Sequence, residues 1–598
     1  MREYSAPAIV EIPGSANLTE IVFQRAASEP DAVMLRRKDP SGGWRDVTAR
    51  KFRDEVTLVA KGLIASGIEP GDRVALMSRT RYEWTVLDYA ILTAGAITVP
   101  IYETSSAEQV EWIAGDSGAK AAFAETPDHE AIFEEVRGRL PTMTNVWRIS
   151  APVLEQLTRA GSEVTDEEID KRRTAPGAAD VATIIYTSGT TGKPKGCELT
   201  HANLLSDVRN AVAGALSDVF EVAGGSTLLF IPLAHVFSRI IQVGCLESGT
   251  VLGHTSTSGD LLADLGSYKP TFILAVPRVF EKVYNGAEQK ATADGKGKIF
   301  RAAAETSIAY SRSLDSGGAG VGLRLKHALF DRLVYGKLRA AVGGQARFAV
   351  SGGAALGDRL GHFFRGVGIT ILEGYGMTET TAAATVNRPN RNKVGTVGQP
   401  LPGVAVKIAD DGEILIKGPN VFTGYWHNDA ATAEMMDGDW IRTGDLGSLD
   451  DEGFLSVTGR KKEIIVTAGG KNVAPAVLED RIRAHPLVSQ AMVVGDARPY
   501  VGCLITLDEE AIEFWKQQHG KPADATIADL ASDPDINAEI QDAVHEANKA
   551  VSRAESIRRF RVLQTDFTEE GGQLTPSMKV RRNVVAKDFS ADIEALYA

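Results

Sequence analysis

Short β-rich apolar runs alternate with helical stretches along most of this chain. The runs at residues 74–77, 181–186 and 348–350 are each followed within three residues by Ser or Gly, and the segment YEWTVLDYAILTAGA at 82–96 has helical periodicity. This alternation is typical of a layered α/β architecture, which is the fold class that we predict. Because the 598 residues far exceed the roughly 250 to 300 at which a single core stops growing, we also expect more than one domain.

Two changes of pattern divide the first 460 residues. A charged helical region spans about residues 280–341, and its apolar residues predict one face of a packed helical insertion. Those residues are Leu325, Leu329, Leu333, Phe330, Val334 and Leu338. From about residue 394 to 460, short strands alternate with Gly and Asp turns, as in GEILIKGP, which predicts a small β-barrel-like subdomain. We assign residues 1–460 to one large N-terminal domain of layered α/β sheets.

The residues after 463 have the size of a small independent domain. Strand patterns at 491–494 and 502–507 precede a helical pattern that begins at Pro534, with Ile536 and Ile540 at helical spacing. We predict a small α+β C-terminal domain at 464–598, joined to the large domain through residues 461–463.

The charge of the chain argues against one class of partner. With a formal net charge of −13, the average field repels nucleic acid, so we expect no nucleic-acid partner. A small basic cluster contains Arg558, Arg559 and Arg561. We expect it to be a solvent-exposed surface, and peripheral contact with the inner face of a membrane is the alternative. Nothing in the sequence indicates an oligomeric state.

The cysteines and the N-terminus predict a cytoplasmic protein. Cys197, Cys245 and Cys503 are odd in number and lack CxxC spacing, which indicates neither a disulfide framework nor a zinc site. The start MREYSAPAIVEIPGS has no apolar signal core, and the longest apolar stretch, around residues 90–101, is well short of the roughly 18 residues of a membrane span.

The stretch YTSGTTGKPKG at 186–196 predicts a phosphate-binding loop. Glycines let backbone N–H groups approach a ligand, hydroxyls add donors, and Lys193 and Lys195 add charge. A Walker A loop would need Gly where Thr187 stands and Ser or Thr where Pro194 stands. A proline directly after Lys193 also disfavours a helix that starts there. We therefore expect this loop to be a mobile cover over the phosphates of a nucleotide.

This loop resembles the signature of the acyl-adenylate-forming superfamily, which includes acyl-CoA synthetases. Six further motifs follow in family order: IPLAHVF at 231, SGGA at 351, LEGYGMTET at 372, WIRTGDLG at 440, GRKKEIIVTAGGKNVAP at 459 and LTPSMKVRR at 574. Together they cover most of the chain, which makes chance agreement negligible. PLAHVFSR, VPRVFEKVY and the helical insertion are most similar to long-chain fatty-acid–CoA ligases.

The resemblance implies that ATP and Mg²⁺ activate a fatty acid to acyl-AMP, with release of pyrophosphate, and that CoA then takes the acyl group. It implies that Tyr375 stacks on adenine, Thr378 contacts phosphate, Glu379 binds the metal and Asp445 accepts hydrogen bonds from the ribose with help from Arg460. The full set of implied nucleotide-binding residues is Thr187, Ser188, Gly189, Thr190, Thr191, Gly192, Lys193, Gly352, Gly353, Ala354, Glu373, Gly374, Tyr375, Gly376, Thr378, Asp445 and Arg460.

The same resemblance implies roles for residues outside the nucleotide site. His235 lies beside the substrate carboxylate, and Lys579 is the catalytic lysine that bridges carboxylate and α-phosphate. Because Lys579 lies beyond the predicted boundary, the C-terminal domain has to swing, with Lys462 as its hinge position. After the swing, the segment Ala468, Gly469, Gly470 and Lys471 lines the channel for CoA. Cys197 has no visible activating partner, which favours a packing role.

The sequence departs from the family pattern at one position. Some fatty-acid-activating relatives place an aromatic gate four residues after the histidine, where this chain has Arg239. Another residue or the helical insertion would then form the gate, and the sequence does not reveal the depth of the acyl tunnel.

Hypotheses of three classes remain open at this point. The leading one is an ATP-dependent long-chain fatty-acid–CoA ligase; an adenylate-forming ligase for an aromatic or short-chain acid, or with an acceptor other than CoA, is the alternative. A phosphoryl-transfer ATPase is disfavoured by the missing Walker A pattern. A non-catalytic nucleotide-binding protein is disfavoured by the presence of Glu379, Asp445 and Lys579.

Overall fold

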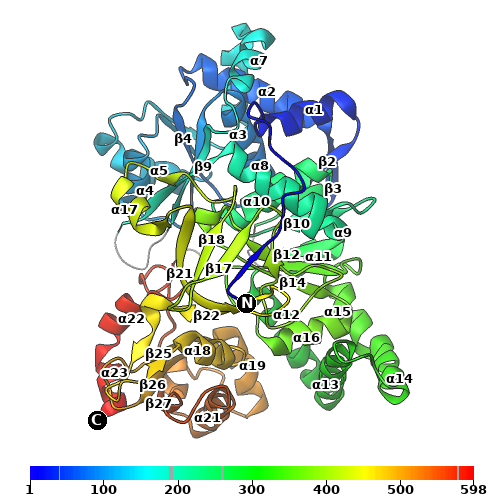
Figure 1. The fold of residues 1–598 in the computed structure, drawn as a ribbon, viewed down its shortest axis with the longest axis vertical. Helices are drawn as coiled ribbons and strands as arrows, with labels where there is room; N and C mark the ends of the chain where they lie inside the picture. Colours follow the sequence, from blue (N-terminus) through cyan, green and yellow to red (C-terminus); the bar gives the residue numbers. More distant parts are fainter. Residues whose placement is uncertain (40, 188–192, 257–260, 576–577) are drawn as a thin grey trace.

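The structure is a computed structural model that describes residues 1–39, 41–187, 193–256, 261–575 and 578–598. Figure 1 shows a large α/β body with a smaller domain, coloured from gold to red, beneath it. The predicted α/β class, with a large N-terminal and a small α+β C-terminal domain, is confirmed. The predicted phosphate-loop residues Ser188, Gly189, Thr190, Thr191 and Gly192 lie outside the described residues.

The first sheet is mainly parallel and has seven strands in the order β19–β9–β8–β5–β4–β6–β7. They are β4 (Arg73–Met77), β5 (Ile97–Ile101), β6 (Ala121–Ala124), β7 (Asn145–Arg148), β8 (Val181–Thr187), β9 (Lys195–Thr200) and β19 (Gly424–Tyr425). Side chains alternate between its faces: Val74 and Leu76 join the apolar core with α2 (Ala49–Ala65) and α3 (Tyr82–Thr93), whereas Ala75 and Met77 join a second core. That core contains α4 (Ala107–Asp116) and α5 (Pro127–Val136). Burial on both faces explains the continuous apolar runs of the sequence.

Two further sheets complete the layered part of the large domain. One is the five-stranded sheet β12 (Phe272–Ala275), β13 (Phe348–Ser351), β14 (Thr370–Tyr375), β15 (Thr385–Val386) and β16 (Gln399–Pro400). The other is the four-stranded sheet β10 (Ser226–Leu229), β11 (Val251–His254), β2 (Val33–Lys38) and β3 (Trp44–Thr48). The helices α8 (His201–Asn210), α9 (Ser217–Phe220), α10 (Val236–Ser248) and α11 (Leu261–Tyr268) occupy the chain between β9 and β12.

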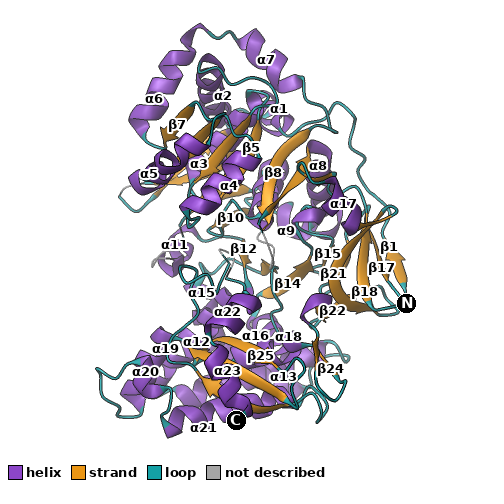
Figure 2. Cartoon of the chain, turned by 90° about the vertical axis from the view of Figure 1, so that its left-hand side faces the viewer, coloured by secondary structure: helices purple, strands orange, loops and turns teal. Residues whose placement is uncertain are grey.

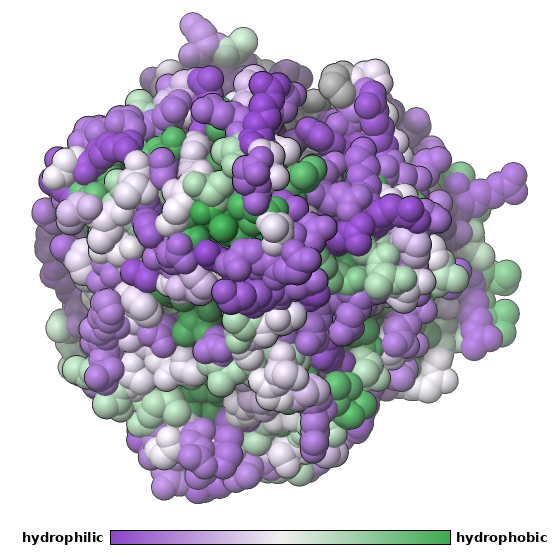
Figure 3. All heavy atoms as spheres, turned by 90° about the horizontal axis from the view of Figure 1, so that it is seen from above, coloured by the Kyte–Doolittle hydropathy of each residue, from purple (hydrophilic) through white to green (hydrophobic). Residues whose placement is uncertain are grey.

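The remaining elements near the N-terminal side are α1 (Thr19–Ser28), α6 (Ala151–Ala160) and α7 (Asp166–Thr174). Figure 3 looks down on the end of the molecule that carries α1, α2 and α7, and shows a mostly hydrophilic face with small apolar groups. Within the described ranges, no helix combines the length and the apolar character needed to cross a bilayer.

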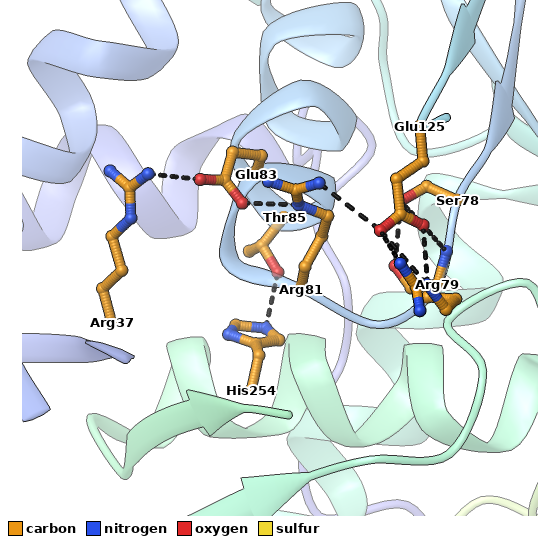
Figure 4. A network of polar contacts seen from close by, with 8 residues as sticks. All are labelled: Arg37, Ser78, Arg79, Arg81, Glu83, Thr85, Glu125 and His254. Atoms are coloured by element: carbon orange, nitrogen blue, oxygen red, sulfur yellow. Dashed lines mark hydrogen bonds and ion pairs between the residues drawn. The ribbon is translucent and has the colours of Figure 1, made fainter. Parts of the chain in front are cut away.

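A chain of ion pairs anchors the N-terminal end of α3 to neighbouring strands (Figure 4). Glu83 accepts from Arg37 on β2 at 2.5 Å and from Arg81 at 2.7 Å, and Arg79 pairs with Glu125 after β6 at 2.9 Å. Burial alone would raise the pKa of Glu83 and Glu125. The hydrogen bonds and positive charges of the three arginines outweigh burial, so the pKa of both acids is lowered. We read this cluster as structural, because its charges are already paired.

The β-rich region after residue 394 forms a six-stranded antiparallel sheet. It contains β1 (Glu3–Ser5), β17 (Ala405–Ile408), β18 (Glu413–Lys417), β21 (Trp440–Leu449), β20 (Met436–Asp437) and β22 (Leu455–Arg460). The short helix α17 (Asp429–Met435) precedes β20. Strand β1 lies near the N-terminus and pairs antiparallel with β17, with Tyr4 opposite Val406.

The helical insertion consists of α12 (Pro277–Ala293), α13 (Gly297–Leu314), α14 (Val321–Phe330), the π-helical turn η4 (Asp331–Tyr335) and α15 (Gly336–Ala341). It leads into β13, and α16 (Asp358–Val367) then packs on α13. Figure 1 shows α13 and α14 together at the outer corner of the molecule.

The prediction of one packed apolar face in this insertion was wrong. Phe330 and Leu338 are buried, but Leu325, Leu329 and Leu333 are 69%, 57% and 48% exposed. At 3.6 residues per turn, the row that begins at Leu325 lies about 140° around the helix from the row that begins at Phe330. The two rows are therefore separate stripes, and only one of them packs.

The C-terminal domain has apolar cores of its own. Its three-stranded sheet is β25 (Val488–Val494), β26 (Val501–Leu507) and β27 (Ile557–Val562), and a two-stranded sheet is β23 (Ile465–Val466) and β24 (Asn472–Val473). The helices are α18 (Pro475–Arg483), α19 (Glu509–Gln518), α20 (Ile527–Leu530), α21 (Pro534–Asn548), α22 (Arg582–Asp588) and α23 (Ser590–Tyr597). The two apolar clusters of this domain draw on residues 465–596 alone.

Polar contacts dock this domain on the large one. Arg278 on α12 pairs with Asp508 at 2.5 Å, and Thr104 donates to Glu569 at 2.5 Å. Figure 2 shows α22 on the side of the C-terminal domain that faces the large domain. This placement brings the segment around residue 579 to the large domain.

Candidate active site

A cavity of about 800 Å³ lies where the parallel sheets, the antiparallel sheet and the C-terminal domain meet. One part of its wall is polar and comes from the ends of β8, β13 and β14, from residues 460–463 and from the segment 579–583. The other part is apolar and lies mainly along α8 and α10. The cavity is large enough for a nucleotide and part of a second substrate.

Backbone rather than side chains forms the wall beyond β13 and β14. Gly352, Gly353, Gly374 and Gly376 all line the cavity at the carboxyl ends of these parallel neighbours. A side chain at Gly376 would place its Cβ 1.7 Å from the carbonyl oxygen of Ala382, so only glycine fits there. The missing side chains leave room for a ligand against the strand ends.

Asp445 on β21 holds both carboxylate oxygens in hydrogen bonds. Arg460, its register partner on β22, donates from Nε to Oδ1 at 2.9 Å, and the hydroxyl of Tyr375 donates to Oδ2 at 2.7 Å. Burial, followed by the charge of Asp445, raises the pKa of Tyr375 well above its usual range. A carboxylate oxygen accepts more than one hydrogen bond, so Asp445 can still accept from ligand hydroxyls.

Glu379 is a buried carboxylate beside the predicted phosphate loop. It lies in the short turn η5 (Thr378–Thr380), and Tyr425 on β19 donates its hydroxyl to Oε1 at 2.6 Å. The ammonium of Lys195 lies 4.8 Å from the centre of the same tyrosine ring. Thr187, Lys193, Lys195, Thr378 and Glu379 all line this part of the cavity. The region thus combines hydroxyls and two ammonium groups with one acid, a set suited to phosphates and a cation.

His235 forms the N-cap of α10 and lines the cavity at the junction of its polar and apolar parts. Its Nδ1 accepts the backbone N–H of Phe237 at 3.1 Å, so in the neutral ring the proton is on Nε2. Burial and the nearby charge of Lys579 lower the pKa of His235 to about 4. The ring is therefore neutral at physiological pH and has one N–H donor free of this cap.

Lys579 reaches the cavity from the C-terminal domain. Its backbone N–H donates to Thr575 Oγ1 at 3.1 Å and its carbonyl accepts from the N–H of Thr575 at 2.9 Å. Lys579 is one of the residues that line the cavity, and it keeps exposed surface. Desolvation, followed by repulsion from Arg460, lowers the pKa of Lys579 although Asp445 and Glu379 act in the opposite direction. His235, Arg460, Asp445 and Glu379 are thus within electrostatic reach of one lysine.

The apolar part of the cavity runs between α8 and α10. Its lining includes Val208, Val212, Leu216, Phe220, Phe237, Ile240 and Ile241. Gly244 on α10 lies at this lining, and a Cβ there would contact the ring of Phe220 at 3.4 Å. Such a wall suits an apolar chain and offers it few polar partners.

Arg239 does not gate this part of the cavity. Its side chain is fully buried and pairs with Asp88 at 2.5 Å, and it donates to Thr183 at 2.9 Å. Gln242, one turn along α10, donates to the second oxygen of Asp88 at 3.1 Å. Arg239, at the position that is aromatic in some relatives, therefore anchors α10 to α3 through its ion pair with Asp88 and to β8 through Thr183. Phe237 lies in the cavity wall instead.

Most of the predicted site residues come together, but some do not line the cavity. Lys462 does line it, in the short turn η6 (Lys461–Glu463). Ala354, Glu373 and Asp445 are not part of the described lining, and Asp445 lies directly behind Tyr375. Ala468, Gly469, Gly470 and Lys471 form an exposed turn between β23 and β24, away from the cavity. The structure does not bring that turn to the site in this domain arrangement.

The sequence did not predict several residues of the site, among them Tyr425, Glu413 and Asp207. Tyr425 bonds Glu379, Glu413 lines the cavity beneath Lys461, and Asp207 is a buried acid in the apolar wall. Each comes from a segment without a family motif, so only spatial proximity could reveal it. Cys197 is fully buried and burial raises its pKa well above the usual range, which agrees with the predicted packing role.

Comparison with known proteins places this site in a family. A model described as AMP-binding enzyme matches residues 22–426, and one described as AMP-binding enzyme C-terminal domain matches residues 462–598. The chain is similar to the long-chain-fatty-acid–CoA ligase FadD15 of Mycobacterium bovis, with 54% identity over 600 aligned positions that cover 100% of both chains.

Solved structures share the fold at lower identity. The anthranilate CoA ligase AuaEII in complex with anthranoyl-AMP has a TM-score of 0.71 at 19% identity and covers 97% of this chain and 99% of its own. The o-succinylbenzoate CoA synthetase of Bacillus subtilis in complex with ATP and magnesium ion has a TM-score of 0.68 at 21% identity, with 94% and 98% covered. With both family models matched in order and a full-length relative above half identity, the chain belongs to the family of AMP-binding enzymes.

Proposed function

We propose that this protein is an ATP- and Mg²⁺-dependent ligase that activates a long-chain fatty acid to acyl-AMP and then transfers the acyl group to CoA. The observation that carries the proposal is the single cavity in which a carboxylate-and-lysine polar end continues into an apolar channel, with His235 at the junction. The full-length similarity to a long-chain-fatty-acid–CoA ligase supports the substrate class and the acceptor.

In the first half-reaction, a carboxylate oxygen of the fatty acid attacks the α-phosphorus of ATP. The new O–P bond forms as the bond to the β-phosphate bridge oxygen breaks, and pyrophosphate leaves. Two anions have to approach, so the main work is charge neutralisation and alignment. Lys579 would neutralise the carboxylate and the α-phosphate, and the Nε2–H of His235 would donate to the carboxylate.

Other residues would hold the nucleotide during this step. Tyr375 would stack on adenine, Asp445 and Arg460 would hold the ribose, and Thr187, Lys193 and Thr378 would contact phosphates. The glycine-lined strand ends, with Gly352 and Gly374 in the wall, provide the close approach that this requires.

The residues present fit a magnesium ion that arrives with the nucleotide. Glu379 is a single buried carboxylate, and the described part of the chain contains no cluster of three or more potential metal-binding His, Cys, Asp or Glu side chains. Mg²⁺ is commonly held by one or two carboxylates together with substrate phosphates. Glu379 would hold the ion, which would neutralise phosphate charge when bound.

In the second half-reaction, the CoA sulfur attacks the carbonyl carbon of acyl-AMP. The C–S bond forms, the C–O bond to AMP breaks and the thiol proton passes to solvent. We propose that residues 464–598 rotate about the hinge 461–463 between the two steps, with residues 1–460 as the fixed domain. Two observations support this rotation: the C-terminal domain has separate apolar cores, and the turn 468–471 is not part of the described cavity lining.

Pyrophosphate release tests the proposal. The assay would supply ATP and Mg²⁺ with fatty acids of graded length, with and without CoA, and would identify the acyl product by mass. We expect pyrophosphate and AMP, with acyl-CoA formation highest for long chains. Acyl-AMP as the only acyl product in the presence of CoA would mean a different acceptor, and orthophosphate with ADP would overturn the proposal.

A further inference from the structure

The helical insertion exposes an apolar stripe along α14 and η4. Figure 1 shows α14 at the outer corner of the molecule. Val321, Leu325, Leu329 and Leu333 follow each other at intervals of four residues along α14 and η4, and are 75%, 69%, 57% and 48% exposed. Ala328 lies between them on the same side and is also exposed. Residues four apart share one helix face, so these side chains form one continuous strip.

The opposite face of the same segment is already packed. His327 stacks on Tyr310 with ring centres 3.8 Å apart, and Phe330 and Tyr335 are buried. The exposed leucines are therefore not needed to hold α14 in place. Four large apolar side chains in water on one short segment mark an interaction surface, whereas single exposed leucines need no explanation.

Basic side chains border this strip. Arg324 and Lys326 lie about 100° to either side of Leu325 around the helix, and Arg332 and Lys337 continue the pattern along η4 and α15. All four are exposed, and within the described ranges none forms an ion pair with a carboxylate. The one acid in the segment, Asp331, pairs with Arg339 at 2.7 Å. The charges that face outward with the leucines are therefore all positive.

The local charge runs against that of the whole chain. Residues 321–340 contain five Lys or Arg and one Asp, which gives a formal charge of +4, whereas the chain carries −13. Leucines on one side with long basic side chains at their border are the features by which a helix lies in the plane of an anionic lipid surface. The aliphatic stems of Arg and Lys can pack beside the leucines while their charges reach the headgroups.

We propose that the outer face of residues 321–337 docks this protein on an anionic membrane surface. A second copy of the chain fits this face less well, because a symmetric contact would bring the same four cations of each copy together. An acidic lipid surface complements both the apolar and the positive parts of the face. The proposal does not depend on the ligase activity, since these residues do not line the cavity.

Vesicle flotation of the full chain tests the proposal. Wild-type protein would be mixed at low and at physiological salt with vesicles of phosphatidylcholine alone, or of phosphatidylcholine with phosphatidylglycerol. We expect flotation with the anionic vesicles only, and weaker flotation at higher salt. The variant L325S/L329S/L333S should lower the partition coefficient by about tenfold or more, and so should R324Q/K326Q/R332Q/K337Q at low salt.

A matched control separates this face from exposed apolar residues in general. L58S/V222S removes two side chains that are 45% and 43% exposed elsewhere on the chain, and should float like wild type. All variants should keep the wild-type unfolding temperature and the wild-type rate of pyrophosphate release with a water-soluble acid, so a failed flotation would not be confused with a failed enzyme.

Several results would overturn the proposal. One is that wild type and L325S/L329S/L333S float equally well. Another is that R324Q/K326Q/R332Q/K337Q binds the anionic vesicles as well as wild type at low salt, and a third is that wild type floats with no vesicle. Light scattering that finds a wild-type dimer which the leucine variant converts to a monomer would assign the face to a second copy instead.

Discussion

The two ends of the cavity are built in different ways. At the polar end, the two acids of the motifs have specified partners: Asp445, directly behind the wall, accepts from Tyr375 and Arg460, and Glu379 in the wall accepts from Tyr425. At the apolar end, the only described acid in the wall is Asp207, and the Oδ2 atom of its carboxyl lacks a hydrogen-bond partner among the described residues. Side chains there are aliphatic or aromatic and act through their shape.

This difference predicts how the two ends respond to change. Directional hydrogen bonds and charges fail when one atom is removed, whereas an apolar wall responds in proportion to the volume that is added or lost. Substitutions at the polar end should therefore affect every acid substrate alike. Substitutions at the apolar end should change the choice among acids.

The largest effect should come from Lys579→Ala. It removes the only described lysine that the C-terminal domain extends into the cavity, and adenylation should fall by about a thousandfold, as for loss of a main transition-state charge contact. Thioester formation from supplied acyl-AMP should stay within a few-fold, because that step uses another domain arrangement. The two half-reactions would be measured by pyrophosphate release and by acyl-CoA formation.

The exposed Lys587 on α22 supplies the control for this variant. Lys587→Ala should leave both half-reactions unchanged. If Lys579→Ala slowed both half-reactions equally, the proposed domain rotation would be wrong.

A smaller effect at the same end should follow Asp445→Asn. The change leaves Arg460 with a neutral partner and removes one acceptor oxygen, so kcat/KM for ATP should fall by about a hundredfold for all acids. Steady-state kinetics with a short and a long acid would measure it. Asp450→Asn, on the nearby surface where Asp450 pairs with Lys393, is the control. If kcat/KM fell only with long acids, the proposed difference between the polar and apolar ends would be wrong.

At the apolar end, Gly244→Leu should shorten the space for the acyl chain. Its Cβ would contact Phe220, and the added side chain should lower the rate with the longest acids by about tenfold, since each buried methylene is worth about 0.8 kcal/mol. The KM for ATP and the rate with short acids should stay the same. Gly286→Leu on α12, where an added Cβ meets nothing within 4 Å, controls for the insertion of a leucine. Equal loss for all chain lengths would contradict the assignment of this wall to the acyl chain.

The smallest effect should come from Asp207→Asn and appear in stability. Burial raises the pKa of Asp207 well above 3.8, so in the folded state the carboxyl keeps a proton that the unfolded chain releases. Unfolding stability of the wild type should therefore fall as pH rises above about 4, by up to about 1.4 kcal/mol per pH unit until the folded group titrates.

The asparagine variant lacks this titration, so its melting temperature relative to wild type should rise with pH. Calorimetry from pH 5 to 8 would measure the difference, with the exposed Asp524→Asn as control. A difference that does not change with pH would mean that Asp207 is ionised and paired in the folded protein. The rates for all acids should change by no more than about twofold.

The fold class and much of the polar end could be predicted from the sequence. Local signals suffice for a strand that ends in Gly or Ser, as at Ser351 and Gly374, because the backbone conformation there depends on a few neighbouring residues. Motifs also identified Glu379, Asp445 and Lys579, and both acids lie within electrostatic reach of the lysine although the three are far apart in the chain. The insertion was harder to predict, since the same leucine periodicity describes a packed stripe and an exposed one.

Chemistry that depends on a residue's type and its immediate neighbours was determined by the sequence: the glycine-rich strand ends, the acids and lysines of the motifs, and the alternation that makes an α/β protein. The tertiary structure alone decided which partners these groups meet. It placed Arg239 against Asp88 in the core instead of at a gate, brought Tyr425 to Glu379, and left Leu325 in water. Those outcomes depend on contacts between residues far apart in the chain, and a periodic pattern specifies a face without specifying what covers it.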